Sequence, residues 1–282
     1  METRVSSATK EVIIGEGHPT VLIGERINPT GKKRMAEALR AGDMDIICQE
    51  AVQQVLDGAD IIDVNVSTPG VNEVSLLPKA VLAIMEAVDV PLCIDSSNPD
   101  ALTAALKVYT GKPLINSVNG ETASLNKILP VIKEYGAAVI GLTQDNEGIP
   151  VDAEKRIAVA EKIVQQAKAV GIPHEDVVID CMAMAIGAVP GAGLVTLDAI
   201  KGIKERLGTN QTLGASNISF GLPDRNLINY AFLATTIAAG ITCPIVNVAK
   251  VRPIILATDL VLNHDKRARR YIENYRKQQT QG

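Results

Sequence analysis

Side chains that can bind a small molecule recur along this chain, each time directly after a short apolar run. They are carboxylates, amides and hydroxyls, and the set is rich in Asp and Asn but poor in His, Lys and Cys. In chain order these residues are Glu25, Arg26, Asp63, Asn65, Asp95, Ser96, Asn116, Ser117, Thr143, Gln144, Asp180, Ser216, Asn217 and Asn247. A single polar residue at such a position is often a helix cap or loop anchor, the role that suits Asp63 and Asn247 best. A repeated series indicates a shared binding site.

The composition of this series favours a neutral heterocycle as ligand. One carboxylate accepts two parallel hydrogen bonds from adjacent N–H groups, and an amide side chain both donates and accepts. A pterin or guanine-like edge has the matching pattern of donors and acceptors. The competing interpretation is a Mg²⁺ site made of Asp63, Asp95 and Asp180. A transition-metal centre is disfavoured, because the four cysteines and three histidines are scattered without ligand spacing.

The elements that position these residues alternate regularly between strands and helices. Apolar runs predict strands at residues 21–24, 61–64, 92–94, 114–115, 137–142, 177–179, 212–215 and 244–246. Apolar spacings of three and four predict helices at residues 46–56, 74–88, 100–109, 125–135, 153–170, 197–207, 226–239 and 254–263. Gly58, Gly136, Gly171 and Gly240 follow helices, and Asn98 precedes a proline suited to the first helical turn.

Eight strand–helix units of about 35 residues (282/8) predict an α/β fold, a (β/α)8 TIM barrel. In such barrels the ends of all eight strands meet at one mouth, where the polar series would lie together. A doubly wound open sheet is the alternative, but no glycine-rich phosphate-binding fingerprint follows any strand. We expect one domain over residues 1–282, with a hairpin within residues 1–19 closing the barrel bottom.

Composition narrows the class of protein further. Of 282 residues, 46% are hydrophobic and 21% charged, which is enough to build a large core. The formal net charge of −4 and the presence of only five Tyr, two Phe and no Trp argue against nucleic-acid binding. Without a signal-like start or a run of 18 apolar residues, we expect a cytoplasmic protein that does not cross a membrane. Residues 264–282 form a basic extension, either a solvated helix or a docking element for an acidic partner.

Six segments together resemble the methyltetrahydrofolate:corrinoid protein methyltransferases, a pterin-binding family related to the folate domain of cobalamin-dependent methionine synthase. The resemblance spans roughly residues 20–262. Its segments are GERIN at 24–28, GADIIDVN at 58–65, LCIDSSN at 92–98, LINSVN at 114–119, GLT at 141–143 with GIP at 148–150, and GASNIS at 214–219.

The resemblance implies roles for individual residues. Asp95, Asn116 and Asp180 would hold the pterin ring, and Asn217 would be the catalytic contact to N5, the nitrogen that carries the methyl group. An amide oxygen facing a protonated N5 stabilises the developing cation without competing as a base. Further pterin contacts are expected from Glu25, Asn65, Gln144, Gly214, Ser216, Ser219 and Arg225, and no metal ligand is expected.

The same resemblance implies tetrahydrofolate or methyltetrahydrofolate as substrate, cobalamin delivered on a separate corrinoid protein, and a homodimer. No corrinoid-binding segment of the Asp-x-His-x-x-Gly type occurs in the chain. The loop FGLPDR at 220–225 departs from the glutamine-rich loop of acetogen-type members, with Phe220 in place of a polar contact. This departure favours the second methyltransferase of a corrinoid-dependent demethylation pathway. The loop at 181–193, apolar and rich in glycine, either lines a corrin-facing rim or packs internally.

Two other functions remain open. A dihydropteroate synthase would share GADIID at 58–63 and the Ser-Thr-Pro-Gly stretch at 67–70. The late Ser-Arg-Lys-Ser and Arg-x-His-Asp segments of that family are missing, and the final strand region IVNVA at 245–249 has no Arg or His. A non-catalytic pterin-binding barrel is the second alternative. It is disfavoured because Asp95, Asn116, Asp180 and Asn217 are all present.

Overall fold

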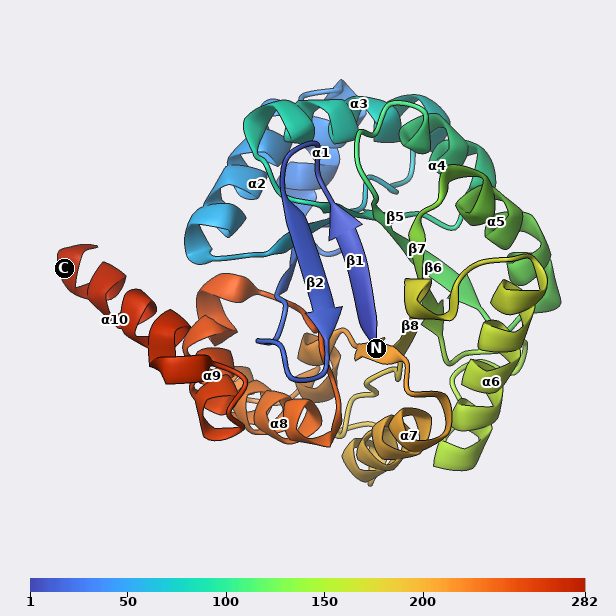
Figure 1. The fold of residues 1–282 in the computed structure, drawn as a ribbon. Helices are drawn as coiled ribbons and strands as arrows, with labels where there is room; N and C mark the ends of the chain where they lie inside the picture. Colours follow the sequence, from blue (N-terminus) through green and yellow to red (C-terminus); the bar gives the residue numbers. More distant parts are fainter. Residues whose placement is uncertain (282) are drawn as a thin grey trace.

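A ring of parallel strands surrounded by helices forms the body of the protein in a computed structural model that describes residues 1–281 (Figure 1). The strands are β3 (Ile23–Ile27), β4 (Ile61–Val64), β5 (Leu92–Asp95), β6 (Leu114–Asn119), β7 (Ala138–Leu142), β8 (Val177–Asp180), β9 (Asn210–Thr212) and β10 (Ile245–Val246). They pair in chain order from β3 to β9, and β10 pairs with β3. A bridge from Gly214 to Ile245 closes the ring. This is the predicted (β/α)8 barrel.

Helices follow the strands and cover the outside of the ring (Figure 1). They are α1 (Lys33–Ala41), α2 (Asp45–Asp57), α3 (Glu73–Ala87), α4 (Pro99–Leu106), α5 (Thr122–Tyr135), α6 (Ala153–Ala169), α7 (Ala192–Leu207), α8 (Arg225–Ala239), α9 (Val248–Val261) and α10 (Arg269–Gln281). Three short 3₁₀ segments are η1 (His174–Asp176), η2 (Ala215–Ser219) and η3 (Lys266–Ala268). As predicted, the Asn98 side chain caps α4 by accepting bonds from the N–H groups of Asp100 and Ala101.

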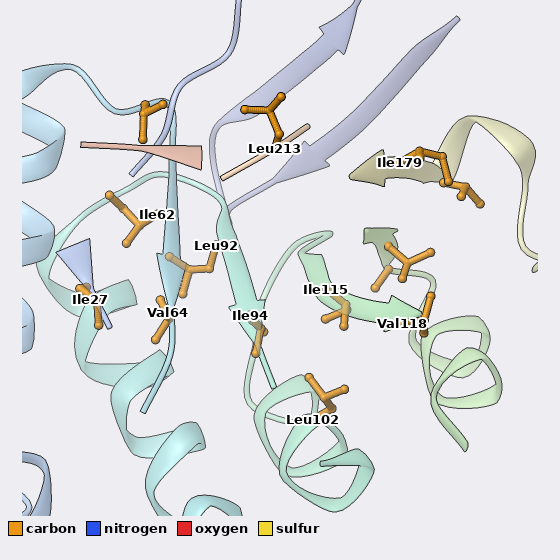
Figure 2. Packing of buried hydrophobic residues seen from close by; sticks show 14 of the residues in the cluster. Ile27, Ile62, Val64, Leu92, Ile94, Leu102, Ile115, Val118, Ile179 and Leu213 are labelled. Carbon is orange, nitrogen blue, oxygen red and sulfur yellow. The ribbon is translucent and has the colours of Figure 1, made fainter. Parts of the chain in front are cut away.

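The side chains of each strand alternate between the barrel interior and the helices. Ile62 and Val64 on β4, and Leu92 and Ile94 on β5, point outward into the cluster between sheet and helices (Figure 2). Because neighbouring residues in a strand face opposite sides, the residues between and after them point inward. The same alternation holds on β6 and β8, where Ile115 and Ile179 belong to the outer cluster. Inward-facing positions at the ends of these strands are therefore where the polar series lies.

A separate hairpin covers the end of the barrel opposite the mouth. Strands β1 (Glu2–Ser6) and β2 (Glu11–Gly15) pair antiparallel and lie across the ring of strands (Figure 1). Val5, Val12 and Ile14 of the hairpin are buried with the lower interior residues of the barrel, including Ile23 and Leu114. The hairpin thus seals the bottom with apolar side chains. Both strands lie within residues 1–19, where the sequence predicts a hairpin.

Several boundaries differ from those that the sequence predicts. The first barrel strand is Ile23–Ile27 rather than 21–24, and the seventh is Asn210–Thr212 rather than 212–215. Helix α9 begins at Val248, six residues before the predicted start at 254, because Pro253 lies inside the helix instead of preceding it. Helix α1 was not predicted at all; it is short and strongly charged, and its buried face consists only of Met35, Ala36 and Leu39.

Candidate active site

Two hydrogen-bonded pairs link the ends of β4, β5 and β6. The amide Nδ2 of Asn65 donates to Asp95 Oδ2 at 2.8 Å, and Nδ2 of Asn116 donates to Asp63 Oδ1 at 3.1 Å. Asp95 and Asn116 are also register partners on adjacent strands. Each amide therefore uses its N–H groups on a carboxylate, which leaves Oδ1 of Asn116 and Oδ1 of Asp95 as acceptors available to a ligand.

The carboxyl groups of this cluster are destabilised in their ionised form. Burial raises the pKa of Asp95 to about 6, against the opposing effect of the Asn65 hydrogen bond. Burial, reinforced by the charge of Asp95, raises the pKa of Asp63 well above its usual range. Two coupled buried carboxyls do not both ionise readily, so burial and mutual repulsion disfavour a second negative charge in this cluster. A ligand that brings N–H donors to Asp95 would supply the missing stabilisation.

Asp180 ends β8 and is 6% exposed. Its Oδ1 accepts a hydrogen bond from the Met182 amide at 2.7 Å, and its main-chain oxygen accepts from the amide and hydroxyl of Thr143. Burial raises the pKa of Asp180 to about 7, although the Met182 bond and the charge of Arg156 act in the opposite direction. The carboxyl is thus poised between charged and neutral forms near neutral pH, as expected for a functional group.

A second cluster surrounds η2, which follows β9. Ser216 Oγ donates to Glu25 Oε2 at 3.3 Å. The Arg225 guanidinium, at the first residue of α8, donates to Ser216 O at 2.7 Å and to Ser219 Oγ at 3.0 Å. Glu25, Ser216 and Arg225 line a pocket of about 240 Å³ together with Asn247 and other residues. Arg225 therefore serves both as a helix-start residue and as a brace for the loop that carries Asn217.

Asn217 is exposed at the mouth, and its side chain makes no hydrogen bond to the residues that the structure describes. Its amide lies close to Gly214, since a Cβ at Gly214 would be 3.1 Å from Asn217 Nδ2. The glycine thus lets the amide fold back over the end of β9. Phe220, which departs from the family pattern, is 70% exposed and its ring lies 5.8 Å from the Arg225 guanidinium carbon. Phe220 points away from the core and supports Arg225 from outside.

The remaining predicted positions are less closely involved. Gln144 is half-buried, and its main-chain oxygen accepts from the Gly120 amide at 2.7 Å, a contact that fixes the loop rather than a ligand. Asn247 precedes α9 without a side-chain capping bond. Within residues 1–281 no three His, Cys, Asp or Glu side chains gather closely enough to hold a metal ion, so the alternative magnesium site gains no support.

Arg156 is a residue near the site that the sequence did not single out. It lies on α6, is fully buried, and bonds to main-chain oxygens of the loop that follows Asp180. Its burial could have been predicted from its position in the helix, because Arg156 lies on the same face of α6 as the buried Ala160 and Ile163. The same loop also contacts η2, since the Ile186 amide donates to Ile218 O at 3.1 Å.

The barrel carries inward carboxylates and amides at the ends of β4 to β6 and β8, an arrangement of hydrogen-bonding groups that suits a flat heterocycle. The chain matches the family model described as pterin binding enzyme over residues 24–247, and it belongs to that family. It is similar to the methylcorrinoid:tetrahydrofolate methyltransferase of Eubacterium limosum, with 32% identity over 264 residues, covering 91% of this chain and 96% of that protein. It is also 32% identical over 266 residues to the methionine synthase of Mycobacterium leprae, covering 90% of this chain but 22% of the synthase.

Solved structures share the architecture. The DHPS of Yersinia pestis superposes with a TM-score of 0.71 at 16% identity, covering 93% of this chain and 100% of that one. The dihydropteroate synthase of Clostridium difficile gives 0.66 at 20% identity, with coverage of 88% and 98%. At these identities the likeness concerns the fold alone. Separately, none of the helices in the described residues is long and apolar enough to span a bilayer.

Proposed function

We propose that this protein transfers a methyl group between the cobalt of a corrinoid carried on a separate protein and N5 of tetrahydrofolate. The observation that carries the proposal is the paired arrangement at the ends of β5 and β6, in which Asp95 and Asn116 each keep one acceptor oxygen free. Adjacent acceptors on neighbouring strands match the adjacent N–H donors of a pterin edge. The 32% identity to a methylcorrinoid:tetrahydrofolate methyltransferase supports the same activity.

The pterin would be recognised by Asp95, Asn116 and Asp180 acting together. Asp180 is buried and has its Oδ1 committed to the Met182 amide, so Oδ2 is the oxygen that would meet the ring. Binding donors to Asp95 and Asp180 favours their ionised forms, and folate binding is thereby coupled to the release of protons. The η2 loop with Asn217 would lie over the reacting part of the ring.

Methyl transfer to folate consists of one bond exchange. The lone pair of N5 forms the new N–C bond, the electron pair of the Co–C bond stays on the cobalt, and the proton of N5 leaves. The Asn217 amide oxygen would accept a hydrogen bond from that N–H while N5 is cationic, which stabilises the transition state without a strong base. In the reverse direction the same oxygen would stabilise the protonated N5 from which the methyl departs. Binding both substrates in line makes up most of the protein's contribution.

The favoured direction is from methylcorrinoid to tetrahydrofolate, as in the second methyltransferase of a demethylation pathway. The similarity to the methylcorrinoid:tetrahydrofolate methyltransferase of Eubacterium limosum supports this direction, and so does the FGLPDR loop that distinguishes the chain from acetogen-type members. A cytoplasmic location and a homodimer are part of the same proposal.

The cobalt absorption spectrum tests the proposal directly. Purified protein is mixed with tetrahydrofolate and methylcobalamin, and in parallel with methyltetrahydrofolate and cob(I)alamin. We expect enzyme-dependent interconversion of the two cobalt species, faster with tetrahydrofolate and methylcobalamin. Folate binding without any conversion, even with a corrinoid protein added, would overturn the transferase in favour of a non-catalytic pterin-binding barrel.

Dihydropteroate synthase is the second candidate, since solved structures of that enzyme share the fold. Asn247 is the only polar side chain of the region 245–249, where that family is expected to carry Arg and His. A coupled assay for condensation of a pterin pyrophosphate with aminobenzoate separates the two enzymes. Condensation at a catalytic rate would replace our proposal, and its absence with retained folate binding supports methyl transfer.

A further inference from the structure

The most unusual buried group outside the pterin cluster is the guanidinium of Arg156, which is 0% exposed. Its Nε donates to Pro150 O at 2.7 Å, in the loop between β7 and α6. Its Nη1 donates to Cys181 O at 2.9 Å, Met182 O at 2.7 Å and Thr196 Oγ1 at 3.1 Å. Arg156 thus ties two neighbouring mouth loops and the start of α7 to one point.

Main-chain carbonyls fill most of these contacts, and no carboxylate in the described residues lies within ion-pairing distance of Arg156. Burying a charge among mainly neutral groups carries a large desolvation free energy. An apolar side chain would fill the same space without that penalty, so a purely structural role does not require an arginine here. Burial lowers the pKa of Arg156, and the charges of Cys181 and Asp180 act in the opposite direction. Asp180 is thus a site carboxyl that interacts electrostatically with this cation.

The contacts of Arg156 also fix the conformation of the residue that bonds to Asp180. Met182 has a φ of +55°, in the left-handed region that a methionine rarely adopts. In this conformation its N–H turns back to Asp180 Oδ1 at 2.7 Å, while its carbonyl is held by Arg156 and by Thr196 Oγ1 at 3.2 Å. Backbone strain of this kind persists only where surrounding contacts enforce it.

We propose that Arg156 is a positioning residue that holds the loop after β8 so that the Met182 amide keeps the Asp180 carboxylate oriented for the pterin. This inference rests on the proposed function, because it assigns Asp180 to pterin recognition. The groups that interact electrostatically with Asp180 are Arg156 from α6, Cys181 from its own loop and Cys243 from the segment before β10, and the Met182 amide bonds to its Oδ1. Burial raises the pKa of both thiols above their usual range, so Arg156 is the charged neighbour of Asp180.

The test compares Arg156→Gln, which removes the cation and its anchors, with Arg156→Lys, which keeps the cation but cannot reach all four acceptors. Arg206→Gln is the matched control. Arg206 lies on α7 and pairs with Glu154 on α6, at 2.7 and 2.8 Å, on the outer surface. Two quantities are measured in each variant: the pH midpoint of the Asp180 carboxyl by ¹³C NMR, assigned with Asp180→Asn, and the affinity for tetrahydrofolate against pH.

In Arg156→Gln the Asp180 midpoint should rise by about one pH unit, because both the cation and the ordered Met182 amide are lost. Folate affinity near pH 7 should fall on the order of tenfold and recover partly at higher pH. In Arg156→Lys the midpoint should rise less, with a several-fold loss of affinity, while Arg206→Gln should match the wild type in both quantities.

A wild-type midpoint and affinity in both Arg156 variants would overturn the inference. If Arg156→Gln does not fold, Arg156→Lys decides alone by the same two quantities. The NMR midpoint needs no ligand, so it still decides the role of Arg156 if the wild type binds no folate. A wild type that binds no folate would count against the proposed function, not against the role of Arg156.

Discussion

Asn116, on β6, donates from Nδ2 to Asp63 Oδ1 at 3.1 Å, although Asp63 lies on β4 and β5 runs between the two strands. The bond joins residues 53 positions apart in the chain and determines which face of the Asn116 amide looks into the mouth. Asp63 is 3% exposed and so acts from beneath the ligand site rather than in it. The buried Asp63 carboxyl thereby orients the Asn116 amide, which is the group that a ligand would contact.

Replacing Asp63 separates its anchoring role from its charge. Asp63→Ala leaves the Asn116 amide free to rotate and removes a buried partner, so folate affinity should fall about 5- to 30-fold. Asp63→Asn can still accept through its amide oxygen and should remain within about threefold of the wild type. Isothermal titration with tetrahydrofolate measures both. Equal losses in the two variants would mean that the hydrogen bond from Asn116 to Asp63 does not account for the effect.

We expect Asp180 to lower the stability of the ligand-free protein at neutral pH and to strengthen folate binding. The pKa of Asp180 is raised by burial from 3.8 to about 7, so the folded protein holds this proton more tightly than the unfolded chain. The contribution of Asp180 to the free energy of unfolding is therefore most favourable below about pH 4. It declines as the pH rises from about 4 to about 7, and it is constant above about pH 7. The difference between 3.8 and about 7 corresponds to at most about 4 kcal/mol at 1.36 kcal/mol per pH unit.

Asp180→Asn should therefore raise the melting temperature of the ligand-free protein at pH 8, with the gain shrinking towards pH 4. The same substitution should weaken folate binding by roughly 1–3 kcal/mol, because a pterin donor loses its carboxylate. Thermal unfolding across this pH range, with and without folate, checks both signs. Unchanged folate affinity would remove Asp180 from the site.

Asn217→Ala should affect turnover much more than binding. The side chain is exposed and makes no hydrogen bond within the described residues, so its loss should cost little folding stability. Loss of a hydrogen bond formed mainly in the transition state should lower the methyl-transfer rate by about 10²- to 10³-fold. Single-turnover spectroscopy at the cobalt, with folate affinity measured separately, gives the two numbers. Turnover near the wild-type rate would end the catalytic assignment of Asn217.

A prediction about folding stability concerns residues at the base of the barrel, away from the proposed site. Asp259 is fully buried and accepts from the Thr20 hydroxyl at 2.6 Å and the Thr20 amide at 2.9 Å. Arg270 on α10 approaches Asp259 at 3.8 Å and Asp60 at 3.4 Å, and donates to Thr20 O at 3.1 Å. Arg270→Met should lower the free energy of unfolding by about 1–3 kcal/mol without changing methyl transfer.

Arg269→Met is the control for Arg270→Met, because the Arg269 side chain is 81% exposed and its ion pair within the described residues is with Glu273 on its own helix. It should change the free energy of unfolding by less than about 0.5 kcal/mol. Urea denaturation of the two variants side by side measures the contrast. A similar effect from both arginines would indicate that α10 contributes through helix formation rather than through its contacts with the barrel.

The order of strands and helices could be predicted because buried parallel strands are continuous apolar runs, and those runs are unambiguous from β4 to β8. Strand β9 was misplaced because Asn210, Gln211 and Thr212 are polar and yet all buried. Their polar atoms find partners far along the chain, such as Ile14 O for Asn210 and Cys243 O for Thr212, which are 196 and 31 positions away. Such partners follow from the closed barrel, and no local pattern reveals them.

The candidate site, like the fold, could be predicted only in part. Carboxylates and amides at strand ends were predictable because alternation turns alternate residues inward. Which amide bonds to which carboxylate was not, since the pairing of Asn65 with Asp95 depends on strand register. The burial of Arg156 was not predicted, because a charged residue on a helix ordinarily faces solvent. The carbonyl oxygens that bind its guanidinium come from a neighbouring loop, whose conformation the local sequence does not reveal.

The barrel wall is uneven, and this asymmetry bears on how such a protein can evolve. Between β9 and β10 the ring is closed by the Gly214–Ile245 bridge and a few main-chain bonds, whereas β6 and β7 pair over five positions. The proposed pterin-binding residues Asp95 and Asn116 lie on the more fully paired strands, while η2, with Asn217, follows the weakly paired junction of β9 and β10. Under the proposed function, mutations in the η2 segment can therefore alter the choice of methyl donor or acceptor while the proposed pterin contacts on β5 and β6 are retained.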